Sequence, residues 1–579
     1  MHKKLLCLYL GLAMLVISLS ACSKSEDKPA DTEVDVSEEV SGDTAKPRPH
    51  SFGKKDKNTE SPEQEGVKHI PISIEEKSYS VTDPETYRLM AECNYFNMIM
   101  DEETAKLYPK LNEEFELYNN NEDIRSREMV EKLREDYLSM SSYVADSDMY
   151  LSDHIKPHVM RSDSNIISIL CEADNFLGGA HGYYWSYGLN YDPESGKELH
   201  LSDVVPEKEK FIELISDKFK EKYSDYAYDE TVTDAGEYLA SMGEDQYESW
   251  PWSMDSEGIT VYFAPYNLGS YALGAQEISI YFDEAPVIFN DKYFNTCEEY
   301  VIPLVNSRSY ELRLGDGSLA EVAVELDAIE EYDAYAIEYK IGNVSIKFDD
   351  YYCYSADNYI VYSGGKHYIY SFSGTENDYV ILNVVDIENK SFDSNRSENA
   401  YLYEPIVSWE DGGDYYSYSN GGPAFTDPES FVVGRRLQLL GTGMGYKTYH
   451  VGEDGYPVSE DEYYMMSNGF AFKAVKDLEL DTVDEAGKVT GTKKVSAGTY
   501  LFNIRTDGES VVDLQLIDES EIEISGESDW KTYMIKDQND DLIDLSKTIY
   551  RVKVDDSDWP PMVNGQEEDS VFEGVMYAG

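Results

Sequence analysis

The pattern of hydrophobic and polar positions changes character several times along this chain. An almost wholly apolar run is followed by a stretch rich in Ser, Glu, Asp, Lys, Pro and Gly, which has too few apolar side chains to offset the entropy of ordering. Mixed helical and strand-like periods come next, and short alternating strands between Gly, Asp and Asn turns dominate the rest. The pattern predicts a leader over residues 1–22, a disordered tether over 23–68, an α+β domain over 69–298, and all-β domains over 299–429 and 430–579.

Both periods occur within the predicted α+β domain. Strands are predicted at His69–Ile74, Ser164–Cys171, Gly258–Phe263 and Glu277–Phe282. Helices are predicted at Pro84–Asn97, at Glu102–Ser141 with breaks near Pro109 and Asn119–Asn121, and around Phe211, Ile212, Ile215 and Phe219. Met129, Leu133 and Tyr137 lie four residues apart, which places them on one face of a helix.

Helical periodicity is nearly absent after Tyr300. Strands are predicted at Tyr310–Leu314, Ala320–Leu326, Ala336–Ile341, His367–Ser371 and Tyr379–Val385. Short strands punctuated by turns fit a sandwich, a barrel or a propeller fragment. Further along, Lys494–Leu516 resembles the strand–turn–strand core of bacterial SH3-like domains, although Ser510 stands where those domains usually carry a tryptophan. A small barrel is therefore expected near the end of the chain.

The N-terminus has the pattern of a lipoprotein leader. Lys3 and Lys4 precede the apolar run LLCLYLGLAMLVISL, which is too short to span a bilayer but suits a signal peptide. The run ends in Leu19-Ser20-Ala21-Cys22, which resembles the lipobox of bacterial lipoproteins. The resemblance implies cleavage before Cys22, lipid on its thiol, and anchoring at the outer face of the cytoplasmic membrane. We favour this interpretation over an ordinary secretory leader followed by a chance cysteine.

Charge excludes one class of function. The chain carries 114 acidic and 48 basic residues, for a formal net charge of -66. A surface of this sign repels nucleic acid, so we expect no nucleic-acid partner. It would attract cationic partners at low salt, although solubility alone also explains it.

The cysteines beyond the leader leave their redox state open. Cys93, Cys171, Cys297 and Cys353 lie far apart and form no CxxC pair. They fit either two disulfides outside the cell or four buried thiols, and their scatter argues against a zinc site.

Several motifs together resemble a known domain pair. Gly178-Gly179-Ala180-His181-Gly182 runs into Tyr183-Tyr184-Trp185-Ser186-Tyr187, and Tyr262–Gly274 follows about eighty residues later. With Arg161–Ser164 and Asp192–Leu201, these motifs resemble the paired DUF4163 and DUF3298 domains of Gram-positive surface proteins, over about Ile70–Phe294. That pair occurs in the extracellular region of a lysozyme-sensing anti-sigma factor and in the N-terminal region of a peptidoglycan deacetylase.

The chain departs from both of those architectures. The anti-sigma factor has a cytoplasmic segment and a membrane helix, so with a lipobox at Cys22 we expect no direct transmission to a sigma factor. The deacetylase needs a zinc-binding aspartate–histidine set, and Phe348-Asp349-Asp350 lacks the Thr and Gly that flank its motif. His154 and His158 have HxxxH spacing, but Pro157 between them would break a helix, so we predict loop or surface histidines.

The candidate site residues come from the same motifs. His181 fits a general base or a metal ligand, but we favour a backbone hydrogen bond that holds a glycine-rich turn. An aromatic face that binds a ligand is predicted from His181, Tyr183, Tyr184, Trp185, Tyr266 and Tyr271. Trp250 and Trp252 are further candidates, and core packing is the alternative for the aromatic residues. Asp537, Asn539 and Asp541 mimic the start of an EF-hand, but Leu542 replaces its glycine. We expect no catalytic set, no metal and no cofactor.

The sequence therefore supports three hypotheses. The first is a non-catalytic cell-envelope lipoprotein that binds a cationic muramidase such as lysozyme, or cell-wall glycan. The second is an enzyme that acts on wall glycan, or an accessory subunit of one. The third is a structural surface protein.

Overall fold

The computed structural model describes most of the chain after the predicted tether, and strands predominate over helices. The described residues are 66–84, 86–140, 149–223, 231–305, 308–329, 334–347, 353, 355–374, 380–392, 398–399, 404–408, 416–467, 469–527, 530–536, 543–555, 557 and 560–577. Cys22, Phe348–Asp350 and the EF-hand-like Asp537, Asn539 and Asp541 lie outside them. Within these ranges no helix is both long enough and apolar enough to cross a membrane.

A seven-stranded sheet carries the first part of the fold, in the order β19-β20-β1-β2-β3-β4-β5. Its strands are β1 (Ser73–Thr82), β2 (Leu89–Ile99), β3 (Leu151–Ser162), β4 (Ile167–Phe176), β5 (Tyr183–Tyr191), β19 (Glu404–Ser408) and β20 (Tyr416–Pro423). β2 and β3 are parallel, and the other neighbours are antiparallel. Because β20 pairs with β1, the sheet crosses the predicted boundary between residues 298 and 299.

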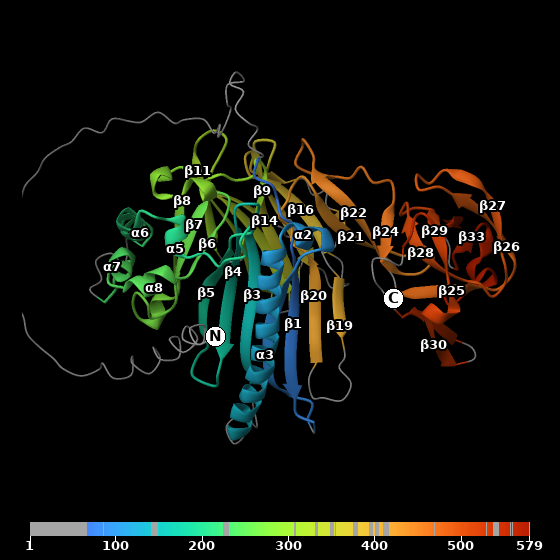
Figure 1. Cartoon of the computed structure of the whole chain (residues 1–579), viewed down its shortest axis with the longest axis horizontal. Helices are drawn as coiled ribbons and strands as arrows, with labels where there is room; N and C mark the ends of the chain where they lie inside the picture. Colours follow the sequence, from blue (N-terminus) through green and yellow to red (C-terminus); the bar gives the residue numbers. More distant parts are fainter. Residues whose placement is uncertain are drawn as a thin grey trace, which may run out of the picture. The chain divides into compact units, whose positions relative to one another are not determined.

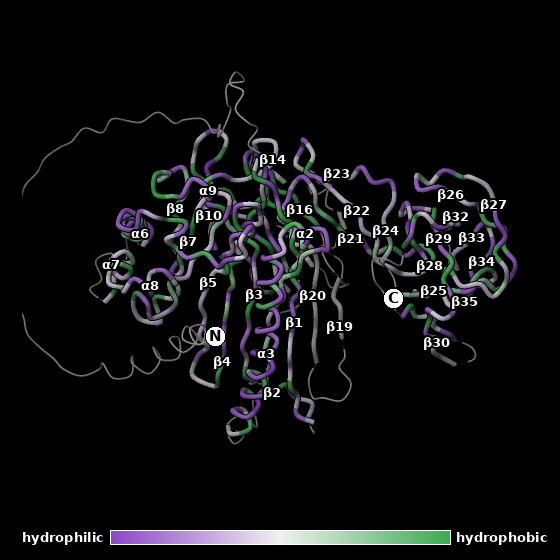
Figure 2. The backbone as a smooth tube through the Cα atoms, in the orientation of Figure 1, coloured by the Kyte–Doolittle hydropathy of each residue, from purple (hydrophilic) through white to green (hydrophobic). Residues whose placement is uncertain are grey.

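The long helix α3 (Pro109–Ser139) covers one face of this sheet (Figure 1). Its buried residues are Leu111, Phe115, Ser126, Val130 and Leu133. Figure 2 shows hydrophobic and hydrophilic colouring alternating along this helix. The predicted packing of Met129 and Tyr137 beside Leu133 is confirmed.

Two helix predictions in this region are wrong. A helix is predicted over Pro84–Asn97, but residues 89–97 lie in β2, which pairs with β1. The predicted break at Asn119–Asn121 is absent, and α3 continues through it after beginning at Pro109. Asn119 explains the polar cluster, since its side chain accepts from Met98 N at 2.9 Å and donates to Met98 O at 2.8 Å. A polar residue is needed on this buried face to satisfy the backbone of β2.

A smaller helical region follows β5 in the chain. It contains α5 (Leu201–Val204), α6 (Lys208–Lys222), α7 (Ala235–Ala240), α8 (Glu244–Glu248), α9 (Asp291–Phe294) and the sheet β6-β7-β8 (Trp252–Met254, Gly258–Phe263, Gln276–Tyr281). The predicted helix around Phe211 and the two predicted strands are confirmed. Phe211, Ile215 and Phe219 face a common core with Ile259, Val261 and Ile278.

The strands predicted after Tyr300 are also confirmed. One sheet has the order β10-β11-β12-β13 (Ser309–Arg313, Leu319–Ile329, Ala334–Ile341, Val344–Lys347). Another has the order β17-β16-β15-β14-β9 (Ser391–Phe392, Val380–Asp386, Lys366–Gly374, Ser355–Ser363, Tyr300–Pro303).

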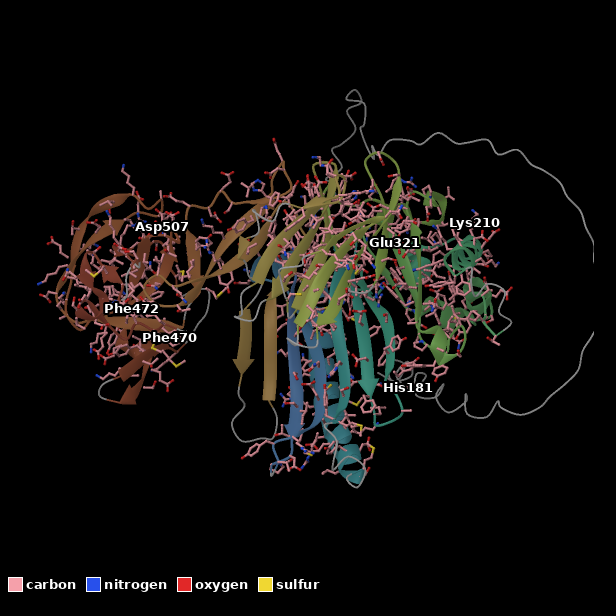
Figure 3. The ribbon with its side chains drawn as sticks, turned by 180° about the vertical axis from the view of Figure 1, so that it is seen from behind. His181, Lys210, Glu321, Phe470, Phe472 and Asp507 are labelled. Carbon is pink, nitrogen blue, oxygen red and sulfur yellow. The ribbon has the colours of Figure 1, made fainter. Side chains whose placement is uncertain are left out.

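The predicted SH3-like segment forms a hairpin of β28 (Tyr500–Thr506) and β29 (Val511–Ile517). Its turn is held by Asp507, which accepts hydrogen bonds from the backbone of Glu509, Ser510 and Val511 (Figure 3). The main strand path runs β21-β22-β24-β28-β29-β32-β26-β27 (Phe431–Leu437, Gly443–Val451, Tyr464–Ser467, Tyr500–Thr506, Val511–Ile517, Ile549–Asp555, Leu478–Val483, Val489–Val495). Over the described residues this path does not close into a barrel.

The four cysteines beyond the leader are buried free thiols. Burial raises the pKa of Cys93 and of Cys297 to about 12 and that of Cys353 to about 11. A thiol with such a pKa stays protonated at neutral pH and is a poor nucleophile. Of the two alternatives that the sequence leaves open, the structure has the thiols.

A buried arginine joins the sheet to the helical region. Arg161, at the end of β3, pairs with Asp163 at 2.6 Å and donates to the backbone carbonyls of Tyr293 and Asn295 at 2.7 and 2.6 Å. Asp163 also accepts from the backbone of Ile166, which shapes the turn between β3 and β4. The guanidinium therefore has partners on both sides of the junction.

We predict that Asp163→Asn destabilises this junction by about 3 kcal/mol, because the substitution leaves a buried guanidinium without its counter-charge. Hydrogen exchange of the amides in β3 and β4 measures the change. Lys106→Ala, which removes the exposed pair with Glu102, is the control and should change stability by less than about 0.5 kcal/mol. Equal protection in both variants would contradict the prediction.

Candidate functional site

Four aromatic rings, two from the β4–β5 hairpin and two from the segment between β7 and β8, gather at the end of this hairpin, where Figure 3 shows His181. His181 stacks on Tyr271 with ring centroids 3.9 Å apart. Tyr266 and Tyr184 contact the same ring, with centroids 5.5 and 6.2 Å away. We call these four residues the aromatic platform. Tyr266 is 56% exposed and Tyr184 is 40% exposed, so the platform offers ring surface to solvent.

Hydrogen bonds fix the platform to the glycine-rich turn. His181 Nδ1 lies 2.8 Å from Gly182 O, and the Tyr271 hydroxyl donates to the same oxygen at 3.0 Å. The hydrogen bond expected for His181 is therefore present, and the His181 side chain is exposed. Among the described residues, no group of three or more His, Cys, Asp or Glu is placed to hold a metal ion.

Tyr266 has an unusual backbone conformation. Its φ is 74°, in the left-handed region that residues other than glycine seldom adopt. Asn267 holds the turn, because its side chain accepts from Ala264 N at 2.7 Å and its backbone N–H donates to Ala264 O at 3.0 Å. Strain of this kind costs free energy and is common at binding sites.

The other predicted aromatic residues separate into two groups. Tyr183 and Trp185 stack on each other at 5.7 Å, and Trp185 also lines the cleft described next. Trp252 is only 3% exposed and belongs to the core of the helical region, and Trp250 packs against that core. For Trp250 and Trp252 the interpretation as a ligand-binding face is therefore wrong, and core packing holds.

A cleft of about 1280 Å³ begins beside the platform. A row of side chains crosses five neighbouring strands along its wall, and each member is paired with the next in the strand register: Ser78, Asn94, His154, Asp174 and Tyr184. Tyr184 belongs to both the row and the aromatic platform. The cleft and the platform are therefore continuous.

His154 occupies the centre of this row. Its Nε2 lies 3.1 Å from Glu92 Oε2, and its Nδ1 lies 3.6 Å from Asp174 Oδ2. Burial alone would lower the pKa of His154, but these two carboxylates outweigh it and raise the pKa to about 9. The imidazole is therefore protonated at neutral pH.

The sequence predicts His154 and His158 as loop or surface histidines. The prediction of a loop is wrong, because both belong to β3, where their side chains are partly exposed. Pro157 is tolerated there, since the pairing of β3 with β2 runs from Leu151 to His154 and ends before it. On the side of β3 that faces β2, the backbone beyond His154 is unpaired, so Pro157 removes no hydrogen bond there. His158 contacts Glu172 at 2.9 Å.

Arg308 lies in a segment that follows the helical region in the chain, and its side chain lines the cleft. Its guanidinium donates to Glu172 at 2.7 Å, to Glu277 at 2.6 Å and to Ser186 Oγ at 2.9 Å. Burial opposes ionisation of Glu172, but His158 and Arg308 lower its pKa to about 2. Arg308 therefore joins β4, β5 and β8 around one charged cluster.

Comparison with known families identifies one part of this site. Residues 202–283 match the family model described as "Protein of unknown function (DUF3298)". These residues form a DUF3298 domain. The match spans α6 to α8 and the whole β6–β8 sheet, so the DUF3298 domain supplies Tyr266 and Tyr271 of the platform and Glu277 of the cleft.

Two solved structures are similar to this chain. A DUF3298 family member from Bacteroides fragilis NCTC 9343 has 18% identity and a TM-score of 0.27, with 39% of this chain and 93% of that chain covered. A DUF3298 family protein from Pseudomonas aeruginosa PAO1 has 15% identity and a TM-score of 0.26, with 40% of this chain and 97% of that chain covered. No curated protein matches the chain.

We predict that His154 titrates near pH 9 in the folded protein, and NMR of the imidazole measures this. Because this pKa lies above the ordinary value of 6.5, protonated His154 stabilises the fold fully below about pH 6.5. That contribution is lost as the pH rises through about 9. Glu92→Gln should lower the pKa, and His154→Gln identifies the resonance. An imidazole that titrates near 6.5 would refute the ion-pair geometry.

Proposed function

We propose that this chain is a non-catalytic binding protein of the cell envelope, and that the platform and cleft bind cell-wall glycan. The observation that carries the proposal is the continuity of exposed aromatic rings with a polar cleft through Tyr184. In this proposal Cys22 carries the lipid anchor, residues 23–68 form the tether, and strands β1 to β5, which precede the DUF3298 domain in the chain, correspond to DUF4163.

The chemistry of the two surfaces suits a sugar chain. Aromatic faces offer apolar area with little conformational entropy to lose, which supports stacking on a pyranose ring. Binding sites usually combine such faces with a few well-placed polar groups. The cleft volume exceeds the range of about 300–1,000 Å³ that is typical of small-ligand pockets, so it has room for an oligosaccharide.

The ionisation states support binding rather than catalysis. His154 is protonated at neutral pH and Glu172 is ionised, so the first is a poor general base and the second a poor general acid. Glu76 is the carboxyl group that the enzymatic alternative would need, since burial raises its pKa. Turnover of wall glycan that is lost in Glu76→Gln would favour that alternative.

We predict that Tyr266→Ala weakens binding of wall oligosaccharides about tenfold, because it removes the most exposed tyrosine ring of the platform; this corresponds to ~1.4 kcal/mol. Isothermal titration calorimetry measures the affinity. Tyr87→Ala is a matched control, since Tyr87 is also an exposed tyrosine with positive φ, at 83% exposure and 57°, and lies outside the platform and cleft. Equal affinity in the two variants would argue against the platform.

The second candidate ligand is a cationic muramidase such as lysozyme. The net charge of -66 favours it, because a strongly acidic surface attracts a cationic protein over long range. Binding of a muramidase through long-range charge does not require the cleft.

If the muramidase is the ligand, lysozyme should bind saturably at low salt and lose affinity steeply towards about 0.15 M salt, where exposed charges are screened beyond about 8 Å. Surface plasmon resonance at both salt concentrations measures this. A neutral protein of similar size is the control. Absence of saturable binding at low salt would exclude this candidate.

A further inference from the structure

Two buried amide oxygens in the cleft wall have no hydrogen-bond partner. Gln276, at the start of β8, is 7% exposed, and its Nε2 donates to Leu273 O at 2.6 Å. That bond identifies the other amide atom as the oxygen, and Gln276 Oε1 is unsatisfied. Asn94 Oδ1, in the row that crosses the sheet, is unsatisfied as well. Buried acceptors without a donor are costly and rare, so they indicate a missing partner.

The missing partner is a hydrogen-bond donor. Among the described residues that line the cleft, the unsatisfied buried side-chain atoms are these two oxygens, and both accept. Gln276 Oε1 is covered by its neighbours in this state, so a donor reaches it only after the side chain shifts. The shift breaks no hydrogen bond of Oε1, because that atom has none.

Charge narrows the chemistry of the donor further. Carboxylates outnumber cationic side chains in the cleft lining: Glu76, Glu92, Glu172, Asp174, Glu277 and Asp357 face Lys77, Lys156, Lys222, Arg308 and protonated His154. An ammonium group has three donors, no acceptor and a positive charge, which fits a wall of acceptors with surplus carboxylate. A hydroxyl group brings an acceptor along with its donor.

The position of Gln276 links this subsite to the platform. Its amide donates to Leu273, which ends the short helical turn Tyr271–Leu273 that begins at a platform residue. The neighbouring Gly274 lies so close to Tyr184 that an added Cβ would be 3.3 Å from the hydroxyl. Asn94 is paired with His154, whose positive charge disfavours a cation there. The Gln276 side of the cleft is therefore the place for an ammonium group.

We propose that the cleft binds a glycan containing amino sugars with free ammonium groups, and that Gln276 Oε1 accepts from one of them. This inference rests on the proposed glycan binding and adds the chemical class of the sugar. One sugar ring lies on the aromatic platform, and the ammonium group of a neighbouring unit enters the cleft.

The test compares three oligomers by calorimetry with the full chain: the β-1,4 tetramers of glucosamine, N-acetylglucosamine and glucose. At about pH 5.5 the free amine is protonated. The glucosamine tetramer should bind at least tenfold more tightly than either of the others. Equal affinity for all three would overturn the ammonium subsite and leave glycan binding intact. Absence of binding by all three would overturn glycan binding itself.

Substitutions test whether the preference for the glucosamine tetramer depends on Gln276. Gln276→Met keeps the size of the side chain but removes the acceptor, and should lower the affinity for the glucosamine tetramer about tenfold. Gln276→Glu keeps an acceptor oxygen and adds charge, and should retain or increase the preference. Gln515→Met is the matched control, because Gln515 is buried in the C-terminal β region with its amide bonded to Asp544. A preference unchanged in Gln276→Met would overturn the assignment.

Discussion

The Arg161 guanidinium connects two structural units that share little continuous sequence. The Arg161 guanidinium donates hydrogen bonds to Asp163 and to backbone carbonyls at the C-terminal end of the helical region. Two further contacts work in parallel, since Asn190 donates to Trp252 O at 2.9 Å and Ser168 Oγ accepts from Met254 N at 2.8 Å. Because the β4–β5 hairpin and the segment after β7 each supply half of the platform, the rings meet only if this junction holds the two segments in place.

Close approach of backbone completes the same junction. A Cβ at Gly188 on β5 would lie 1.7 Å from Trp252 O on β6, so any larger residue would force the two sheets apart. Arg308 extends the arrangement to a third segment by bonding Glu172 and Glu277. The cleft is therefore lined by charges that already have partners, and such a preorganised wall loses little entropy when a ligand enters.

The sequence predicts local features well and long-range ones poorly. Alternation predicted β7 and β8. The glycine-rich motif identified His181 of the platform, and the Tyr262–Gly274 motif identified Tyr266 and Tyr271. The cleft was missed because Asn94, His154 and Gln276 meet only through a parallel pairing of β2 with β3 and the packing of the DUF3298 domain. Because the β2 segment was predicted to be a helix, the pairing of β2 with β3 could not be predicted. Propensity alone does not reveal pairing partners so distant in the chain.

The acidic surface and the cleft have different electrostatic roles. A net charge of -66 acts over long range, attracts cations and distinguishes little among them. Inside the cleft, protonated His154 pairs with Glu92 and Asp174, and Arg308 pairs with Glu172 and Glu277, so the small surplus of carboxylates does not by itself decide what binds. Discrimination among ligands then depends on unsatisfied acceptors such as Gln276 Oε1. A ligand that lacks the matching donor leaves this buried oxygen unpaired. Long-range attraction therefore governs the encounter, and the geometry of a few buried atoms governs selection.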